Sequence, residues 1–272
     1  MHFLNSAAVL LTAVTWSKSD GVFDLTRSDR LPVTTPKMIS GMIGGRKNAI
    51  IEPSRTGLVI IDMQNYFLHP GLSPGATKGR AIVNTTVSMV DGFRKAGIKV
   101  LWTNWGLDDF DLLTMPPAFL SGFSANGSDL QNETFGSDMG TVDGIPAGRL
   151  LMRNQWNSQL YGPLHPLQVE GVDAGTDFYF NKNRLSGMWG AQTPLGLFLQ
   201  ENGITTLFFG GVNTDQCVWG TFLDSYYKGF DVFLVPDISA TTSPQYATDM
   251  CIYNADGDGF VVNSTTILPA IA

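Results

Sequence analysis

The chain is poor in the residues that build disulfide frameworks and metal sites. Its 272 residues include only two cysteines and three histidines. Two cysteines in so long a chain do not make a disulfide framework, although a single bridge between Cys217 and Cys251 stays open. The histidines His2, His69 and His165 are scattered, with neither His-x-His nor HExxH spacing. We therefore expect no bound metal ion.

Charge and glycine motifs exclude further classes of protein. Only 15% of the residues are charged, and the formal net charge is −7. An acidic surface argues against nucleic acid or an anionic membrane as a partner. The sequence contains neither a GxGxxG nor a GK[ST] motif, so a dinucleotide or phosphate cofactor is not expected. We expect no cofactor of any kind and a small molecule as the partner.

The N-terminal residues bear on localisation. The apolar run Ala7–Val14 is too short to span a membrane, and no Lys or Arg precedes it as in a secretory signal peptide. Glycosylation sequons begin at Asn84, Asn126, Asn132 and Asn263, but they matter only in a secreted chain. We favour the cytoplasm, with secretion as the alternative.

Strand and helix patterns alternate along most of the chain. Apolar, β-branched runs predict strands at 58–61, 98–103, 177–180, 205–209 and 231–235. Helices are predicted near 79–96, 194–201, 216–228 and 244–253. This alternation predicts a three-layer α/β/α fold with a mainly parallel central sheet.

Composition divides the chain into an extension, a domain and an insertion. Residues 1–56 mix Ser, Thr, Pro and Gly and predict an N-terminal extension packed on the domain. Residues 57–272 predict one domain. Within it, residues 104–170 are rich in Gly, Pro, Asn and Asp without a sustained period. So long an irregular stretch predicts a lid-like insertion.

Polar residues follow several predicted strands. Asp62, Asn104, Lys182 and the turn at 210–217 each come at or after a strand end. In parallel sheets ligands bind beyond the carboxyl ends of the strands. We therefore expect these four segments to meet at one site.

The residue types at this edge favour thiol chemistry. Cys217 lies near the start of a predicted helix, where N–H groups stabilise a thiolate and can hold an oxyanion. Lys182 would lower the pKa of that thiol, and Asp62 could move its proton. Two alternatives stay open: a buried, inert cysteine, and a Cys–His dyad with His69 or His165.

Three segments in order resemble the isochorismatase-like cysteine hydrolases: LVIIDMQNYF at 58–67, KNRLSGMWG at 182–190 and GGVNTDQCVWGTFLDSYYKGFDVFLVPD at 210–237. The resemblance covers about residues 55–255. It implies that Asp62, Lys182 and Cys217 are the catalytic residues. It also implies a cis peptide before Asn213, an oxyanion hole built from the backbone N–H groups of Asn213 and Cys217, and a homo-oligomer.

The resemblance also suggests a branch of that family. Asp62 and Lys182 are 120 residues apart (182 − 62), which looks more like the ureidoacrylate and N-carbamoylsarcosine amidohydrolases than like nicotinamidases. The metal-binding Asp and His cluster of nicotinamidases has no counterpart in NWGLDDFD at 104–111. The implied reaction is metal-independent hydrolysis of a small amide or ureido compound through a thioester, with release of ammonia.

Substrate contacts are assigned to Gln64, Asn104 and Trp105, which lie at or near strand ends. An alternative function is a catalytically weak or redox-responsive small-molecule-binding protein that keeps the pocket, and it too could be secreted.

Overall fold

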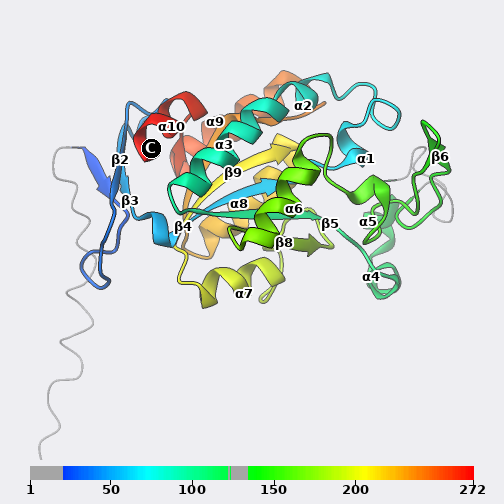
Figure 1. Ribbon diagram of the computed structural model, residues 1–272, viewed down its shortest axis with the longest axis horizontal. Helices are drawn as coiled ribbons and strands as arrows, with labels where there is room; N and C mark the ends of the chain where they lie inside the picture. The colour runs from blue at the N-terminus through cyan, green and yellow to red at the C-terminus, as the bar shows by residue number, and fades with distance from the viewer. Residues whose placement is uncertain (1–20, 122, 124–133) are drawn as a thin grey trace, which may run out of the picture.

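The computed structural model describes residues 21–121, 123 and 134–272 (Figure 1). Six parallel strands form its central sheet, in the order β11-β10-β9-β4-β5-β8. These strands are β4 (Thr56–Ile61), β5 (Lys99–Trp105), β8 (Asp177–Lys182), β9 (Thr206–Val212), β10 (Asp231–Ala240) and β11 (Phe260–Val261). Helices cover both faces, so the predicted three-layer α/β/α fold is confirmed.

Two hydrophobic clusters hold the layers together. The first lies between the sheet and α2 (Thr77–Ala81), α3 (Val83–Lys95), α6 (Leu164–Ala174) and α10 (Ser264–Ile271). The second lies between the opposite face and α7 (Pro194–Glu201), α8 (Trp219–Tyr227) and α9 (Gln245–Asp258). Strand β4 is buried along its whole length, as its unbroken apolar sequence requires. In Figure 1, α3 lies along one side of the sheet and α7 along the other.

A second, small sheet precedes the domain. Its strands are β1 (Val22–Asp24), β2 (Lys37–Ser40) and β3 (Asn48–Ile51), in the order β1-β3-β2, and a short 3-10 turn at Pro53–Arg55 leads from it into β4. Ile39 and Ile51 are fully buried in the first cluster, and β2 packs on α10. In Figure 1 this sheet lies at the end of the molecule from which the central strands start.

The stretch 104–170 contains more regular structure than its composition predicts. It holds α4 (Asp109–Thr114), α5 (Pro117–Ser121), the hairpin β6 (Thr141–Val142) and β7 (Ile145–Pro146), a 3-10 turn at Trp156–Ser158, and the start of α6. In Figure 1, α4, α5 and β6 lie beyond the carboxyl ends of the strands, near α1 (Asn65–Leu68). The prediction of a wholly irregular stretch was wrong for α6. The buried residues of that helix are only Leu164 and Gly171, which leaves little hydrophobic period to read.

A buried ion pair fixes the edge strand β8 to α3. The guanidinium of Arg94 donates to both carboxylate oxygens of Asp177, at 2.8 and 2.6 Å. The indole N–H of Trp102 donates to the same carboxylate at 2.7 Å. The Asp177 side chain is fully buried, and that of Arg94 is 14% exposed. Because Asp177 begins β8, this pair positions the strand that carries Lys182.

We expect Arg94→Ala to lower the free energy of unfolding by about 3–5 kcal/mol, because it leaves a buried carboxylate without its cation. Arg149→Ala is the control: its ion pair with Asp109 is largely exposed, so a change of at most about 1 kcal/mol is expected. Urea denaturation measures both. Equal losses in the two variants would contradict the assignment.

Candidate active site

Asp62 directly follows the buried strand β4. Its φ of 52° places it in the left-handed region, which is uncommon outside glycine and is found at functional sites. Its backbone N–H donates to the carbonyl of Thr103 at 3.2 Å, and its Oδ1 accepts the backbone N–H of Trp105 at 3.1 Å. The neighbouring strand β5 therefore fixes a carboxylate that is completely buried.

Lys182 is the last residue of β8, opposite Trp105 of β5 in the register of the sheet. Its Nζ lies 2.9 Å from Asp62 Oδ2 and donates to the carbonyl of Arg184 at 3.1 Å. The same ammonium lies 3.8 Å from the centroid of the Trp105 ring, which adds a cation–π contact. Lys182 thus crosses β5 to reach the carboxylate beyond β4.

Cys217 lies in a single π-helical turn, Thr214–Val218, which leads from β9 into α8. The carbonyl of Asn213 accepts the N–H groups of Gln216 and Val218 at 3.0 and 3.2 Å. The Asn213 N–H forms no hydrogen bond with the described part of the chain and remains a potential donor to an oxyanion. The peptide between Val212 and Asn213 is cis, as the family resemblance implies.

A glycine lets β9 approach β4 closely before this turn. Gly211 has a φ of 123°, and a Cβ there would collide with the backbone of Ile61. Strand β9 therefore delivers the cysteine beside Asp62, the residue that follows Ile61.

The three side chains form one electrostatic unit. Burial is the largest influence on Asp62 and raises its pKa, while Lys182 and hydrogen bonds from Cys217 and Trp105 act in the opposite direction. Burial also raises the pKa of the Cys217 thiol, and the negative charge of Asp62 raises it further, whereas Lys182 lowers it. Burial is the largest of these influences on Cys217, so it works against the stabilisation of a thiolate by the start of the helix and by Lys182.

The predicted substrate-binding residues have other partners. The Gln64 side-chain amide donates to the carbonyls of Trp105 and Ser158 at 2.8 and 2.7 Å, and its oxygen accepts the Trp105 N–H at 3.1 Å. Gln64 therefore positions the end of β5 instead of offering its amide to a substrate. Asn104 is fully buried on the other face of β5, and only Trp105 lies directly at the catalytic group.

An aromatic cluster covers Trp105. The rings of Phe119, Phe123 and Phe135 lie 6.1, 5.3 and 5.0 Å from it, centroid to centroid. These residues come from α5 and the segments that follow it. Sequence reasoning missed them, although the aromatic and apolar positions of MPPAFLSGF at 115–123 stand out from a polar insertion. The insertion therefore contacts Trp105 at the candidate site.

The two internal histidines have other neighbours than Cys217. His69 packs against Trp156 and Tyr161, and His165 lines a cavity on the side of α6. Among the described residues, no group of three His, Cys, Asp or Glu side chains could hold a metal ion. Asp108 and Asp111 cap α4 and pair with Arg153.

A known protein family matches most of the chain. The family model described as the isochorismatase domain matches residues 56–266, so the chain belongs to this family of hydrolases. Within the described part of the chain, no helix is long and apolar enough to cross a membrane.

Solved structures with the same fold include three enzymes with different names. Nicotinamidase from Bacillus subtilis is 25% identical, with a TM-score of 0.56, 76% of this chain and 99% of the other covered. N-carbamoylsarcosine amidase from Thermoplasma acidophilum is 22% identical, with a TM-score of 0.55 and coverages of 77% and 96%. A cysteine hydrolase from Pseudomonas syringae pv. phaseolicola is 18% identical, with a TM-score of 0.58 and coverages of 80% and 93%.

The pKa of Cys217 should shift in opposite directions in two variants. Asp62→Asn is expected to lower it, because the carboxylate that holds the thiol proton is removed. Lys182→Met is expected to raise it, because the stabilising cation is removed. The rate of iodoacetamide labelling as a function of pH measures both, with mass spectrometry separating the two cysteines.

Cys251 is the internal control. Burial and the charge of Asp215 raise its pKa to about 11, without a contribution from Asp62 or Lys182. Its labelling profile should therefore not move. Shifts of Cys217 in the same direction in both variants would refute the proposed coupling.

Proposed function

We propose that the chain is a cysteine-dependent amidohydrolase that cleaves the C–N bond of a small amide or ureido compound through a thioester. The observation that carries the proposal is the buried Asp62–Lys182 ion pair at 2.9 Å beside Cys217. The amidases among the similar structures support the same type of bond. No resident metal or cofactor is part of the proposal.

The first half of the reaction forms the thioester. Asp62 takes the thiol proton of Cys217, and Lys182 stabilises the negative charge that remains. The sulfur attacks the carbonyl carbon, whose π electrons move to the oxygen, where the N–H groups of Asn213 and Cys217 hold the oxyanion. When the oxyanion collapses, the C–N bond breaks and Asp62 protonates the leaving nitrogen, which releases ammonia from a primary amide.

The second half returns the enzyme to its resting state. Asp62 takes a proton from water, and the hydroxide attacks the thioester carbonyl. The C–S bond breaks to give the acid, and the sulfur recovers its proton from Asp62. A carboxyl whose pKa is raised by burial is suited to both directions of transfer, because it approaches the pKa range of a general acid and base at neutral pH.

The substrate is expected to be small. The site is covered by the aromatic cluster of Trp105, Phe119, Phe123 and Phe135, so a polymer would have to displace the insertion. A homo-oligomeric state, suggested by the family, and a cytoplasmic location are further parts of this proposal.

Cys217→Ala should abolish ammonia release from the best substrate in a screen of small primary amides, ureido acids and peptides, because no nucleophile remains. Cys251→Ala is the matched control and should keep at least about a third of the rate, since its sulfur takes no part in the chemistry. A folded Cys217→Ala protein with near-normal turnover would overturn the mechanism. Faster cleavage of peptides than of every small amide would overturn the substrate class.

Activity should survive prolonged treatment with EDTA or phenanthroline, because the proposed nucleophile needs no metal-bound water. The measurement is the rate of ammonia release before and after chelation and gel filtration. Loss of activity that zinc or iron restores would place the chain with metal-dependent amidases.

A further inference from the structure

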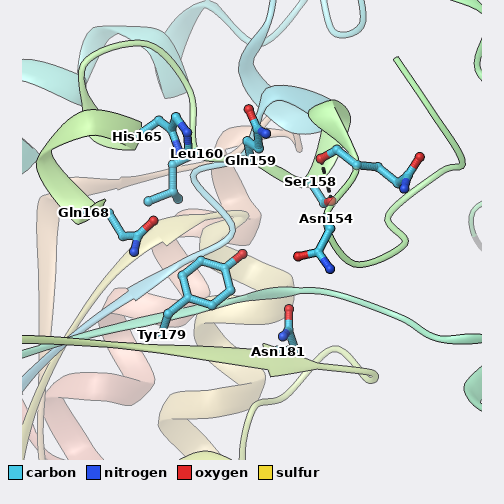
Figure 2. A pocket seen from close by; sticks show the side chains of 9 residues that line it. Asn154, Ser158, Gln159, Leu160, His165, Gln168, Tyr179 and Asn181 are labelled. Atoms are coloured by element: carbon cyan, nitrogen blue, oxygen red, sulfur yellow. Dashed lines mark hydrogen bonds between the residues drawn. The ribbon is translucent and has the colours of Figure 1, made fainter. Parts of the chain in front are cut away.

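A pocket lies on the face of the sheet opposite to the one that carries Lys182. It has a volume of about 350 Å³ and opens between α6, the carboxyl half of β8 and the segment that precedes α6. Figure 2 shows the polar ends of Asn154, Gln168, Tyr179 and Asn181 directed toward the space between them. Its lining comprises Asn154, Gln155, Ser158, Gln159, Leu160, His165, Gln168, Tyr179 and Asn181. We call this the neutral pocket.

The alternation of side chains along a strand separates this pocket from the thiol site. Asn181 and Lys182 are consecutive on β8, so they face opposite sides of the sheet, and their partners in β5 are Asn104 and Trp105. Lys182 therefore lies with Trp105 at the catalytic site, whereas Asn181 faces the neutral pocket. Cys217 does not line it.

Several polar groups around the pocket lack protein partners. No hydrogen bond to another described residue engages the side chains of Asn154, Gln168 or Asn181, whereas the Ser158 hydroxyl lies within hydrogen-bonding distance of the carbonyls of Met152 and Gln155. Asn104 is fully buried, and its side chain lies within reach of the Tyr179 hydroxyl, whose pKa it acts to lower. Asn154 is exposed, and Gln168 and Asn181 are partly exposed, so their amide groups are open to water or to a ligand that replaces it.

The lining carries no Asp, Glu, Lys or Arg side chain. An ion would lose hydration there without meeting an opposite charge. Burial, and then the charge of Asp62, raise the pKa of the Tyr179 hydroxyl to about 12, so this group stays protonated and can both donate and accept at physiological pH. Side-chain amides also offer donors and acceptors together.

We propose that the neutral pocket is a binding site, separate from the thiol site, for an uncharged small molecule whose hydroxyl or ureido groups pair donors with acceptors. The volume falls within the range of about 300–1,000 Å³ that is usual for small-molecule sites. A neutral sugar and a neutral ureide share the required chemistry. The two kinds of ligand differ in size. They also differ in how many of their hydrogen-bonding groups can contact Gln168 on α6 and Tyr179 on β8 at the same time.

Calorimetric titration of the full chain with D-glucose and with allantoin tests the proposal. Glucuronate and glucosamine are the charged counterparts of glucose. At least one neutral probe is expected to bind saturably, and a glucose signal should exceed those of its charged counterparts about tenfold in affinity. Glucose binding alone would identify hydroxyl recognition, and allantoin binding alone would identify ureide recognition. Absence of saturable binding by both neutral probes would overturn the proposal, as would equal binding of the charged sugars.

Substitutions of residues that line the pocket show whether the probe binds there. Gln168→Leu and Tyr179→Phe should each weaken it roughly three- to tenfold, the effect of one lost hydrogen bond. Gln200→Leu is the matched control, because Gln200 is an exposed residue of α7 on the other side of the sheet. It should bind as the wild type does.

Cys217→Ala separates this site from the catalytic one. Binding that persists in Cys217→Ala and weakens in Gln168→Leu supports the neutral pocket, whatever the outcome for the proposed amidohydrolase. Binding that is lost in Cys217→Ala but unchanged in Gln168→Leu and Tyr179→Phe belongs to the thiol site and would overturn the proposal.

Discussion

The ion pair between Lys182 and Asp62 is the constraint on which the site depends. The two side chains are only 3% and 0% exposed, so each charged group has lost its hydration and contacts the other charged group instead. Such pairs contribute little to net stability, because desolvation offsets their attraction. Removing one partner, however, leaves an uncompensated charge. The arrangement is better explained by what it does to a neighbouring thiol than by what it contributes to folding.

The order of the strands in the sheet determines how Lys182 and Asp62 meet. Asp62 extends from β4 and Lys182 from β8, with β5 between them. The lysine must therefore cross a strand, and the residue it crosses is Trp105, whose ring contacts the ammonium and whose backbone N–H donates to Asp62. The Arg94–Asp177 pair at the start of β8 holds the strand on α3 and so supports the position of Lys182 at the other end of the strand.

Burial acts on both members of the proton-transfer pair. It raises the pKa of the thiol and of the carboxyl, so desolvation by itself does not ease proton transfer between Cys217 and Asp62. Lys182 opposes the rise in both pKa values and favours the thiolate that forms when Asp62 takes the proton. The cation therefore acts mainly on the charge that develops during the reaction.

Local sequence patterns predicted the strands and helices that have a clear apolar run or a clear start residue. The run Leu58–Ile61 is buried on both faces and reads as a strand from its sequence alone, and Pro194 marks the first residue of α7. The cis peptide and the roles assigned to Asp62, Lys182 and Cys217 came from resemblance to a family. The C-terminal helix α10 was missed because Pro269 lies inside it, and its start is stabilised by the distant carboxylate of Asp237.

Side-chain direction is what sequence spacing could not supply at the strand ends. Gln64 and Asn104 both follow apolar runs and both carry amides, yet Gln64 turns to the backbone of Trp105 while Asn104 faces the opposite layer. The difference arises from the left-handed backbone at Asp62 and the alternation of β5, neither of which a composition or a motif encodes.

Alternation also gives this sheet edge two chemical environments. On one face, Lys182 and Trp105 create a site with a buried charge pair; on the other, Asn181 and Asn104 stand beside a pocket without charge. Asp62 influences both, since its carboxylate pairs with Lys182 and its charge raises the pKa of Tyr179. The charge of Asp62 therefore reaches both faces of the sheet, across a single layer of strands.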